Sequence, residues 1–182
     1  MPTVTVIIPT FNCANYLAIA LDSLLAQTLS DWQAMIIDDG SKDHTAAVVQ
    51  PYLVDPRIKY QYQENRGLPA ARNAGVVATA SEFIAFLDAD DSLRADALEL
   101  MQTSLRDTQA GWCITDILKR RQDGDVTERS EVPASDPHLC ILREDFIRRA
   151  MFFRRDQFNL VGMYDEAMKY REDWDLLWVE RD

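Results

Sequence analysis

Three apolar runs in the first half of the chain constrain the fold more than any other feature. They occupy residues 4–9, 32–38 and 83–88, and the core of each is nearly continuous instead of alternating with polar residues. Strands of this kind are covered on both faces, as in a parallel sheet. A weaker run at residues 57–63 alternates in polarity and therefore suits a strand nearer the edge.

Helical patterns follow each of these strands. A stripe of leucines marks the first, an alanine-rich stretch marks the third, and the four patterns cover residues 15–27, 43–53, 68–80 and 95–107. The repeated order of strand and helix predicts an α/β fold, a doubly wound and mostly parallel sheet with right-handed crossovers and helices on both faces.

The second half of the chain is less regular. Residues 111–121 predict a strand, and the polar stretch 122–137 predicts a loop or an exposed hairpin because it contains Asp-Gly and two prolines. Residues 146–158 carry both helix and strand signals, so both assignments stay open. Near the end, Trp174, Leu177 and Trp178 recur at helical spacing. The length of 182 residues fits one compact domain with two halves.

Charge and cysteine content exclude several classes of protein. The chain carries 30 acidic and 19 basic residues, for a net charge of -11, which disfavours nucleic-acid binding but allows a small phosphorylated ligand held by local cations. Three widely spaced cysteines without a CxxC pair indicate buried, reduced thiols of a cytoplasmic protein, with no structural zinc. No signal peptide and no apolar run of the ~20 residues needed to span a bilayer is evident.

Each of the three strong strands ends in polar residues. The endings are Pro9-Thr10-Phe11-Asn12, Asp38-Asp39-Gly40-Ser41 and Asp88-Ala89-Asp90-Asp91. In an open parallel sheet the carboxyl ends of the strands share one edge, and ligands bind in the crevice there. Three separate stretches of sequence are therefore expected to supply one site.

The acids at that edge predict a metal. Asp88 and Asp90 are two residues apart, so in extended backbone they point the same way, roughly 6–7 Å apart. At an effective dielectric of ~20 two such charges repel by about 2–3 kcal/mol, and Asp38 and Asp39 are expected nearby. A divalent cation such as Mg²⁺ or Mn²⁺, completed by substrate phosphates and water, would offset this repulsion.

A simpler interpretation of the same acids stays open. Asp91 or Ser92 can cap the helix expected to begin near Arg94, since short polar side chains favour that position. The remaining aspartates would then be solvated.

The stretch 65–75 adds a positive charge to the predicted site. Gly67 and Pro69 mark a loop, and Arg72 falls in the first turns of the helix that follows. Helix N-termini favour anions and arginine forks to phosphate, so Arg72 suits a diphosphate; the alternative is an ordinary surface arginine. Because neither G-x-G-x-x-G nor G-x-x-x-x-G-K-[ST] occurs, NAD enzymes and P-loop NTPases are disfavoured.

At these residues the chain resembles the family 2 glycosyltransferases, an inverting group of nucleotide-sugar transferases with the GT-A fold. The resemblance covers nearly the whole chain, and its five motifs occur in the family's order. They are "TVIIPTFN", "IIDDGSKDHT", "ENRGLPAARNAG", "FIAFLDADD" and "YREDWDLLW".

The resemblance implies roles in binding the donor. Thr10 and Phe11 would line the pocket for the base of the nucleotide-sugar. Asp39 would hydrogen-bond a uracil-type base, and Arg72 would lie beside the nucleotide and its diphosphate.

The resemblance also implies a metal site and a general base. Asp88 and Ala89 would contact the ribose region, and Asp90, with Asp88, would hold Mn²⁺ or Mg²⁺ on the diphosphate. Glu172-Asp173 matches the family's base motif, with Asp173 as the catalytic base. The alternative for this pair is that acids are favoured in the first turn of a helix.

We therefore expect a metal-dependent, inverting glycosyltransferase that moves sugar from a UDP- or dTDP-sugar to a saccharide or lipid-linked saccharide. The resemblance implies bacterial cell-surface polysaccharide or lipopolysaccharide synthesis in the cytoplasm, with peripheral association at the inner membrane face left open. Residues 1–110 would form the donor half and residues 111–182 an acceptor-side half. That half is expected to be truncated, because family members usually extend beyond the position of Asp182. No Q-x-x-R-W, a feature of processive synthases, follows the acidic pair.

Two other functions stay open at this stage. A sugar-phosphate nucleotidyltransferase shares the α/β plan and a metal site, but it usually carries a glycine-rich loop with Lys or Arg after the first strand, and "PTFNCANY" has neither. A fragment that binds nucleotide-sugar without turnover is the non-catalytic alternative.

Overall fold

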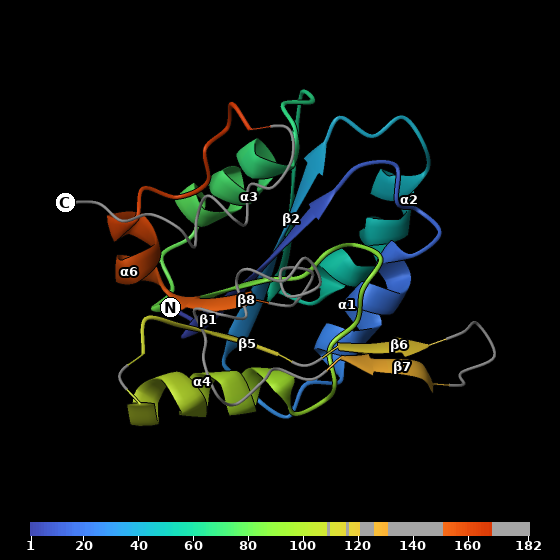
Figure 1. Ribbon diagram of the computed structural model, residues 1–182. Helices are drawn as coiled ribbons and strands as arrows, with labels where there is room; N and C mark the ends of the chain where they lie inside the picture. Colours follow the sequence, from blue (N-terminus) through green and yellow to red (C-terminus); the bar gives the residue numbers. More distant parts are fainter. Residues whose placement is uncertain (109, 116, 121–125, 131–150, 169–182) are drawn as a thin grey trace.

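The protein is built on one six-stranded sheet with the strand order β3-β2-β1-β4-β8-β5 (Figure 1). The computed structural model describes the chain except residues 109, 116, 121–125, 131–150 and 169–182. Within the first four strands all pairs are parallel, whereas β8 pairs antiparallel with both β4 and β5. The strands are β1 (Val4–Thr10), β2 (Trp32–Asp39), β3 (Ile58–Gln63), β4 (Phe83–Phe86), β5 (Trp112–Ile114) and β8 (Met151–Arg154).

The four predicted strands of the first half are confirmed, although β4 ends at Phe86 and not at residue 88, and the second half resolves the open assignments. The stretch 146–158 contains both elements that its signals indicated, β8 and the helix α6 (Arg155–Leu160). The strand expected over 111–121 is two strands, β5 and β6 (Ile117–Arg120). β6 pairs antiparallel with β7 (Val126–Ser130) in a second, two-stranded sheet, so part of the stretch 122–137 belongs to a hairpin.

Helices cover both faces of the large sheet, so its central strands β1, β2 and β4 are buried throughout and mostly apolar. Side chains at alternate positions of β1, such as Val6 and Ile8, pack in a core with residues of α1 and α4, while Ile7 packs on the other face with α3 and α6. The helices are α1 (Leu17–Leu25), α2 (Thr45–Val49), its 3-10 extension η1 (Gln50–Val54), α3 (Leu68–Val77) and α4 (Ala97–Thr108). Among the described residues no helix is both long and apolar enough to cross a membrane.

Helix α3 lies unusually close to the central strand. A Cβ atom at Gly75 would stand 2.5 Å from Cγ2 of Ile7, so only glycine permits this approach. Two residues set where the helix begins. Gly67 stands just before the first turn with φ of 93°, and Pro69 lies within that turn. The packing therefore fixes the N-terminus of α3 at the carboxyl edge of the sheet.

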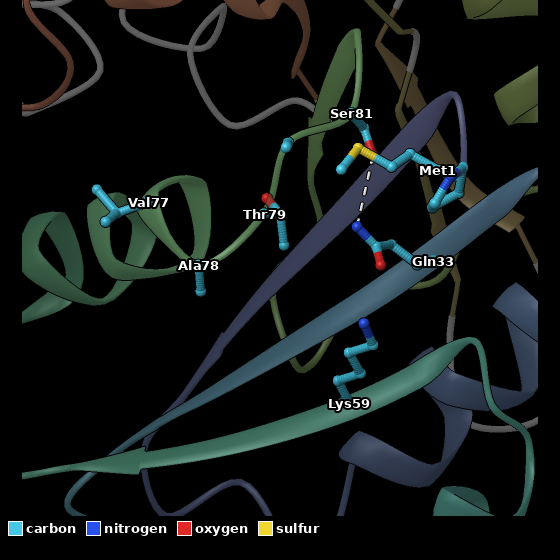
Figure 2. A pocket seen from close by; sticks show the side chains of 9 residues that line it. Met1, Gln33, Lys59, Val77, Ala78, Thr79 and Ser81 are labelled. Carbon is cyan, nitrogen blue, oxygen red and sulfur yellow. Dashed lines mark hydrogen bonds between the residues drawn. The ribbon is translucent and has the colours of Figure 1, made fainter.

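The amino edge of the sheet is hollowed as well (Figure 2). This hollow of ≈ 340 Å³ lies between the start of the chain, Lys59 and the end of α3, and its described lining contains no carboxylate. On its wall the amide of Gln33 donates to the hydroxyls of Thr5 and Ser81, at 2.9 and 3.4 Å. These buried polar groups satisfy one another, so the hollow offers little chemistry compared with the opposite edge.

Candidate functional site

A cleft of ≈ 200 Å³ opens at the carboxyl ends of β1 and β2. Thr10, Phe11 and Asp39, the three residues expected to bind the base, all lie on its wall. The phenyl ring of Phe11 is 47% exposed, although it is a large apolar group, so its surface is available to a flat ligand. The other lining residues are Pro9, Asn65, Gly67, Leu68 and Ala71.

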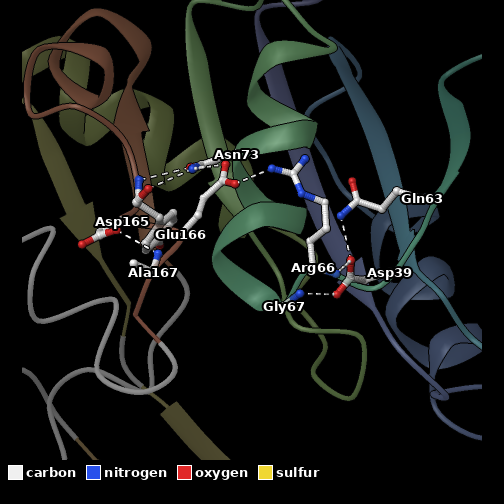
Figure 3. A network of polar contacts seen from close by, with 9 residues as sticks. Asp39, Gln63, Arg66, Gly67, Asn73, Asp165, Glu166 and Ala167 are labelled. Atoms are coloured by element: carbon white, nitrogen blue, oxygen red, sulfur yellow. Dashed lines mark hydrogen bonds and ion pairs between the residues drawn. The ribbon is translucent and has the colours of Figure 1, made fainter.

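Asp39 joins the cleft to the start of α3 (Figure 3). One carboxylate oxygen accepts hydrogen bonds from Nε2 of Gln63 at 2.7 Å and from the backbone N–H of Arg66 at 2.9 Å; the other accepts from the N–H of Gly67 at 2.8 Å. The residue is only 4% exposed. Since a carboxylate offers about four acceptor sites, this geometry leaves about one for a ligand.

Asp38 belongs to a different environment from Asp39, because successive side chains of a strand point to opposite faces. Its oxygens accept from the backbone N–H of Ser41 at 2.8 Å and from the hydroxyl of Tyr60 at 2.6 Å. Burial and the charge of Asp38 raise the pKa of Tyr60 above its ordinary value. Asp38 and Asp39 therefore project to opposite faces of the sheet, and of the two only Asp39 is among the described residues that line the cleft.

Thr10 pairs with Asp38 in the register of β1 and β2, so both side chains lie on the same face of the sheet. The hydroxyl of Thr10 is buried and has no hydrogen-bond partner within the described part of the chain. An unsatisfied buried hydroxyl beside a cleft is unusual in a native protein, and a ligand is one way to satisfy it.

The acids after β4 lie in a turn, not in extended backbone. β4 ends at Phe86, and the N–H of Asp91 donates to the carbonyl oxygen of Asp88 at 3.0 Å. The expectation that the strand runs to residue 88 with its acids in extended geometry is therefore wrong. Ala89 is buried in this turn, whereas Asp90 is exposed.

The alternative that Asp91 or Ser92 caps the following helix is also wrong. Helix α4 begins at Ala97, several residues after both. Its first turn is instead capped from another part of the chain, because Oε1 of Gln27 accepts a hydrogen bond from the N–H of Leu98 at 3.1 Å.

Arg72 is not an ordinary surface arginine, since it is only 4% exposed. Its guanidinium donates to a carboxylate oxygen of Asp88 at 3.1 Å and so balances the charge of that residue. The guanidinium carbon lies 5.1 Å from the centre of the Tyr164 ring and 5.8 Å from that of Phe86. Cation–π contacts of this kind are stronger in desolvated surroundings, so the two rings hold the Arg72 guanidinium beside Asp88 in the turn after β4, while the described lining of the cleft includes Ala71 and not Arg72.

Negative charge remains in the turn after β4. Desolvation raises the pKa of Asp91 to about 6, and repulsion from Asp88 and Asp90 adds to the shift. The parts of the chain that the structure describes contain no group of three or more acidic, histidine or cysteine side chains that could hold a metal. Asp88 and Asp90 nevertheless fit Mn²⁺ or Mg²⁺ as donors, because these ions complete a small carboxylate set with phosphate oxygens and water.

Sequence reasoning missed a polar network beside the cleft (Figure 3). Glu166 accepts from the guanidinium of Arg66 at 2.6 Å and from Nδ2 of Asn73 at 3.1 Å, and Asn73 also bonds the backbone of Tyr164. Arg66 and Asn73 stand in a motif that marks the site, but nothing in the sequence pairs them with residues almost a hundred positions later. Only the fold shows that pairing.

Some predicted residues cannot be placed. Glu172 and Asp173, the expected base pair, lie outside the described residues, as does Cys140. Cys13 and Cys113 are free thiols that are half-buried rather than buried, and desolvation raises the pKa of Cys113 to about 12.

Comparison with known proteins identifies the family. The sequence profile described as glycosyl transferase family 2 matches residues 5–174. Chondroitin synthase of Escherichia coli is 35% identical over 115 residues, which are 63% of this chain and 17% of that protein. An uncharacterized glycosyltransferase of Rickettsia typhi, RT0329, is 29% identical over 185 residues, which are 96% of this chain and 57% of that protein. The chain thus spans less than two thirds of the length of these relatives.

Solved structures share the fold. Residues 1–349 of TarS from S. aureus, in complex with UDP-GlcNAc, superpose with a TM-score of 0.77 at 21% identity, covering 94% of this chain and 51% of that one. A mannosyltransferase, PcManGT from Pyrobaculum calidifontis, in complex with GDP-Man and Mn²⁺, superposes with a TM-score of 0.72 at 21% identity, covering 94% of this chain and 50% of that one. The sheet flanked by helices is therefore a GT-A fold, and the chain belongs to glycosyl transferase family 2.

Proposed function

We propose that this transferase is an inverting enzyme that moves a sugar from a UDP- or dTDP-sugar to an acceptor hydroxyl. The observation that carries the proposal is the cleft that brings Thr10, Phe11 and Asp39 together at the carboxyl edge of the sheet. Family membership supports the reaction class, and the UDP-GlcNAc complex of TarS supports a nucleotide-sugar donor.

The base of the donor is proposed to bind in this cleft. The exposed ring of Phe11 offers a face for stacking, and aromatic–base stacking is worth about 1–3 kcal/mol. The remaining acceptor site on Asp39 would take an N–H of a uracil-type base. Gln63, Arg66 and Gly67 occupy the other hydrogen-bonding positions of the Asp39 carboxylate. The carboxylate is therefore already oriented before the base binds.

The diphosphate is proposed to lie between the N-terminus of α3 and the turn after β4. Helix N-termini favour anions, and Arg72 adds a positive charge beside Asp88 in that turn. Asp90 and Asp88 would hold the divalent cation, which supplies charge stabilisation for the leaving nucleoside diphosphate when it is bound. Asp88 and Ala89 would border the ribose.

Asp173 is proposed as the general base, from the family motif alone. Inverting transfer is an in-line displacement at the anomeric carbon, so the acceptor proton must leave on the face opposite to the diphosphate, and a carboxylate suits that role. Replacing Asp173 by Asn is expected to leave UDP binding unchanged and to abolish transfer. If Asp173→Asn transferred sugar at the normal rate, the assignment would be wrong.

The proposed pathway is bacterial cell-surface polysaccharide synthesis, on a saccharide or lipid-linked saccharide acceptor. Named polysaccharide synthases among the relatives support it, including chondroitin synthase of Escherichia coli and hyaluronan synthase of Pasteurella multocida. This chain covers 17% and 10% of those two proteins. Assaying sugar transfer to saccharide and lipid-linked saccharide acceptors tests the proposed pathway directly.

A nucleotide screen tests the proposed donor. UDP, dTDP and GDP are added to the chain with and without Mn²⁺, and thermal unfolding is recorded. At about a hundred times the dissociation constant, a ligand that binds only the native state should raise the midpoint by roughly 5–10 °C. We expect this with UDP or dTDP plus Mn²⁺, followed by slow hydrolysis of the matching sugar donor. No shift with either nucleotide, or pyrophosphate release from UTP and a sugar phosphate, would contradict the proposal.

A further inference from the structure

The chain reverses sharply after α6 and returns to the donor side of the molecule. Gly162 and Met163 both have positive φ, 90° and 63°, and their N–H groups donate to the carbonyls of Asn159 and Phe158. A left-handed pair of this kind ends a helix and redirects the backbone. The residues that follow, from Tyr164 to Glu166, consequently lie against α3 (Figure 3).

Asn73 holds this returning segment in one register. Its Oδ1 accepts from the N–H of Tyr164 at 3.1 Å, and its Nδ2 donates to the carbonyl oxygen of Tyr164 at 2.9 Å and to Oε1 of Glu166 at 3.1 Å. Asn73 is 5% exposed, so these bonds are shielded from water. An amide that accepts from the N–H and donates to the C=O of the same residue fixes the position of that residue's backbone.

The returning segment contacts the donor site at two places. The Tyr164 ring faces the guanidinium of Arg72, which in turn pairs with Asp88. Glu166 pairs with Arg66, whose backbone N–H donates to Asp39. One continuous set of contacts therefore links the end of the site that carries Asp88 with the end that carries Asp39.

We propose that Asn73, Tyr164 and Glu166 are positioning residues, which set the placement of Arg72 and Arg66 around a nucleoside diphosphate without touching it. We call these three residues the α3 clamp. The inference rests on the proposed function, since it assigns the clamp to donor binding. The α3 clamp makes the affinity for the nucleotide depend on a segment from the second half of the chain.

The first test separates positioning from ordinary packing. Tyr164→Leu removes the ring beside Arg72, and we expect the dissociation constant for UDP with Mn²⁺, measured by calorimetry, to rise about tenfold. Tyr164→Phe keeps the ring and should stay within about twofold of the wild type. Phe158→Leu is the matched control, because Phe158 is buried in the same aromatic cluster and contacts Tyr164, while the described cation–π contacts of Arg72 are to Tyr164 and Phe86.

The expected pattern is a lowered thermal midpoint for both leucine variants but weakened UDP binding for Tyr164→Leu alone. Equal loss of affinity in both, or none in Tyr164→Leu, would overturn the inference while leaving the proposed function intact. If the wild type bound neither UDP nor dTDP, the proposed function would fail first and the inference with it.

A second test does not depend on the core and holds even if Tyr164→Leu fails to fold. Arg66→Gln and Glu166→Gln each break the exposed ion pair, and each should raise the dissociation constant for UDP about twofold to fivefold. Both substitutions act through the same ion pair. The double variant should therefore bind UDP with the same affinity as the single variant that has the larger defect. Asp165→Asn is the control, since Asp165 is exposed and bonds only locally to the N–H of Ala167 among the described contacts. If the two increases in the dissociation constant multiplied in the double variant, or if Glu166→Gln bound UDP more tightly than the wild type, the α3 clamp would be contradicted.

Discussion

Two acidic stretches that look alike in the sequence behave differently in the fold. The β2-end acids, Asp38 and Asp39, are buried at 1% and 4% exposure, and their carboxylates accept hydrogen bonds from the protein itself. Among the β4-end acids, Asp88, Asp90 and Asp91, only Asp88 has an ion pair in the described part of the chain, and the other two are exposed.

The difference follows from where each strand stops. β2 continues through Asp39, so β3 and the loop after it supply donors to both of its acids. β4 stops at Phe86, and its acids lie in a turn beyond the reach of flanking strands. Buried charges need partners within the protein, whereas exposed ones can wait for a ligand. The β2-end acids therefore serve the structure first, whereas we propose that the β4-end acids serve the chemistry.

The largest expected effect tests the β4-end acids. Asp90→Asn should reduce Mn²⁺-dependent sugar transfer by about a hundredfold or more, on the scale of losing one group that stabilises developing charge. The thermal midpoint without ligand should stay unchanged, because the side chain is exposed. Asp96→Asn, an acid that pairs with Arg94 on the same connection, is the control. If Asp90→Asn lowered the thermal midpoint but kept full activity, Asp90 would serve the structure and not the chemistry.

The same change from Asp to Asn at Asp39 should lower the stability of the fold, which Asp90→Asn leaves unchanged. Asp39→Asn leaves one acceptor oxygen and turns an NH₂ group toward backbone N–H donors, which should lower the free energy of unfolding by about 2–3 kcal/mol. Urea denaturation measures this loss, with Asp90→Asn as the reference. If Asp39→Asn were as stable as the wild type, Asp39 would not hold the start of α3.

A smaller effect concerns Tyr60, which donates to Asp38. Tyr60→Phe should lower the free energy of unfolding by about 1–2 kcal/mol at neutral pH, because it leaves a carboxylate oxygen of Asp38 without its donor.

The pH dependence of the free energy of unfolding tests the contact between Tyr60 and Asp38 in a second way. The pKa of Tyr60 is raised in the folded state, so above pH ~10 the unfolded chain loses this proton while the folded one keeps it. The associated stability is complete below pH ~10 and falls by up to about 1.4 kcal/mol for each further pH unit. Denaturation at pH 9 and 11 should show a shallower alkaline decline in Tyr60→Phe than in the wild type. Equal slopes would show that Tyr60 does not contribute.

Local patterns predicted the elements well where one physical signal dominated. The continuous apolar runs located β1, β2 and β4 because both faces of these strands are covered. The signals left 146–158 open, where a short strand and a short helix adjoin, and they were wrong at residue 88, where a turn replaces the last expected strand residues. Short elements carry too few residues for periodicity to separate strand from helix.

The sequence alone determined the α/β order and the edge of the sheet at which Thr10, Phe11 and Asp39 meet, because these depend on strand period and on where each strand ends. Tertiary structure decided what each charge does. Asp38 and Asp39 were separated by the pleat of one strand, and Arg72 was enclosed by Tyr164, a residue that follows it by ninety-two positions. Such partners arise from the path of the chain in space, which no local pattern encodes.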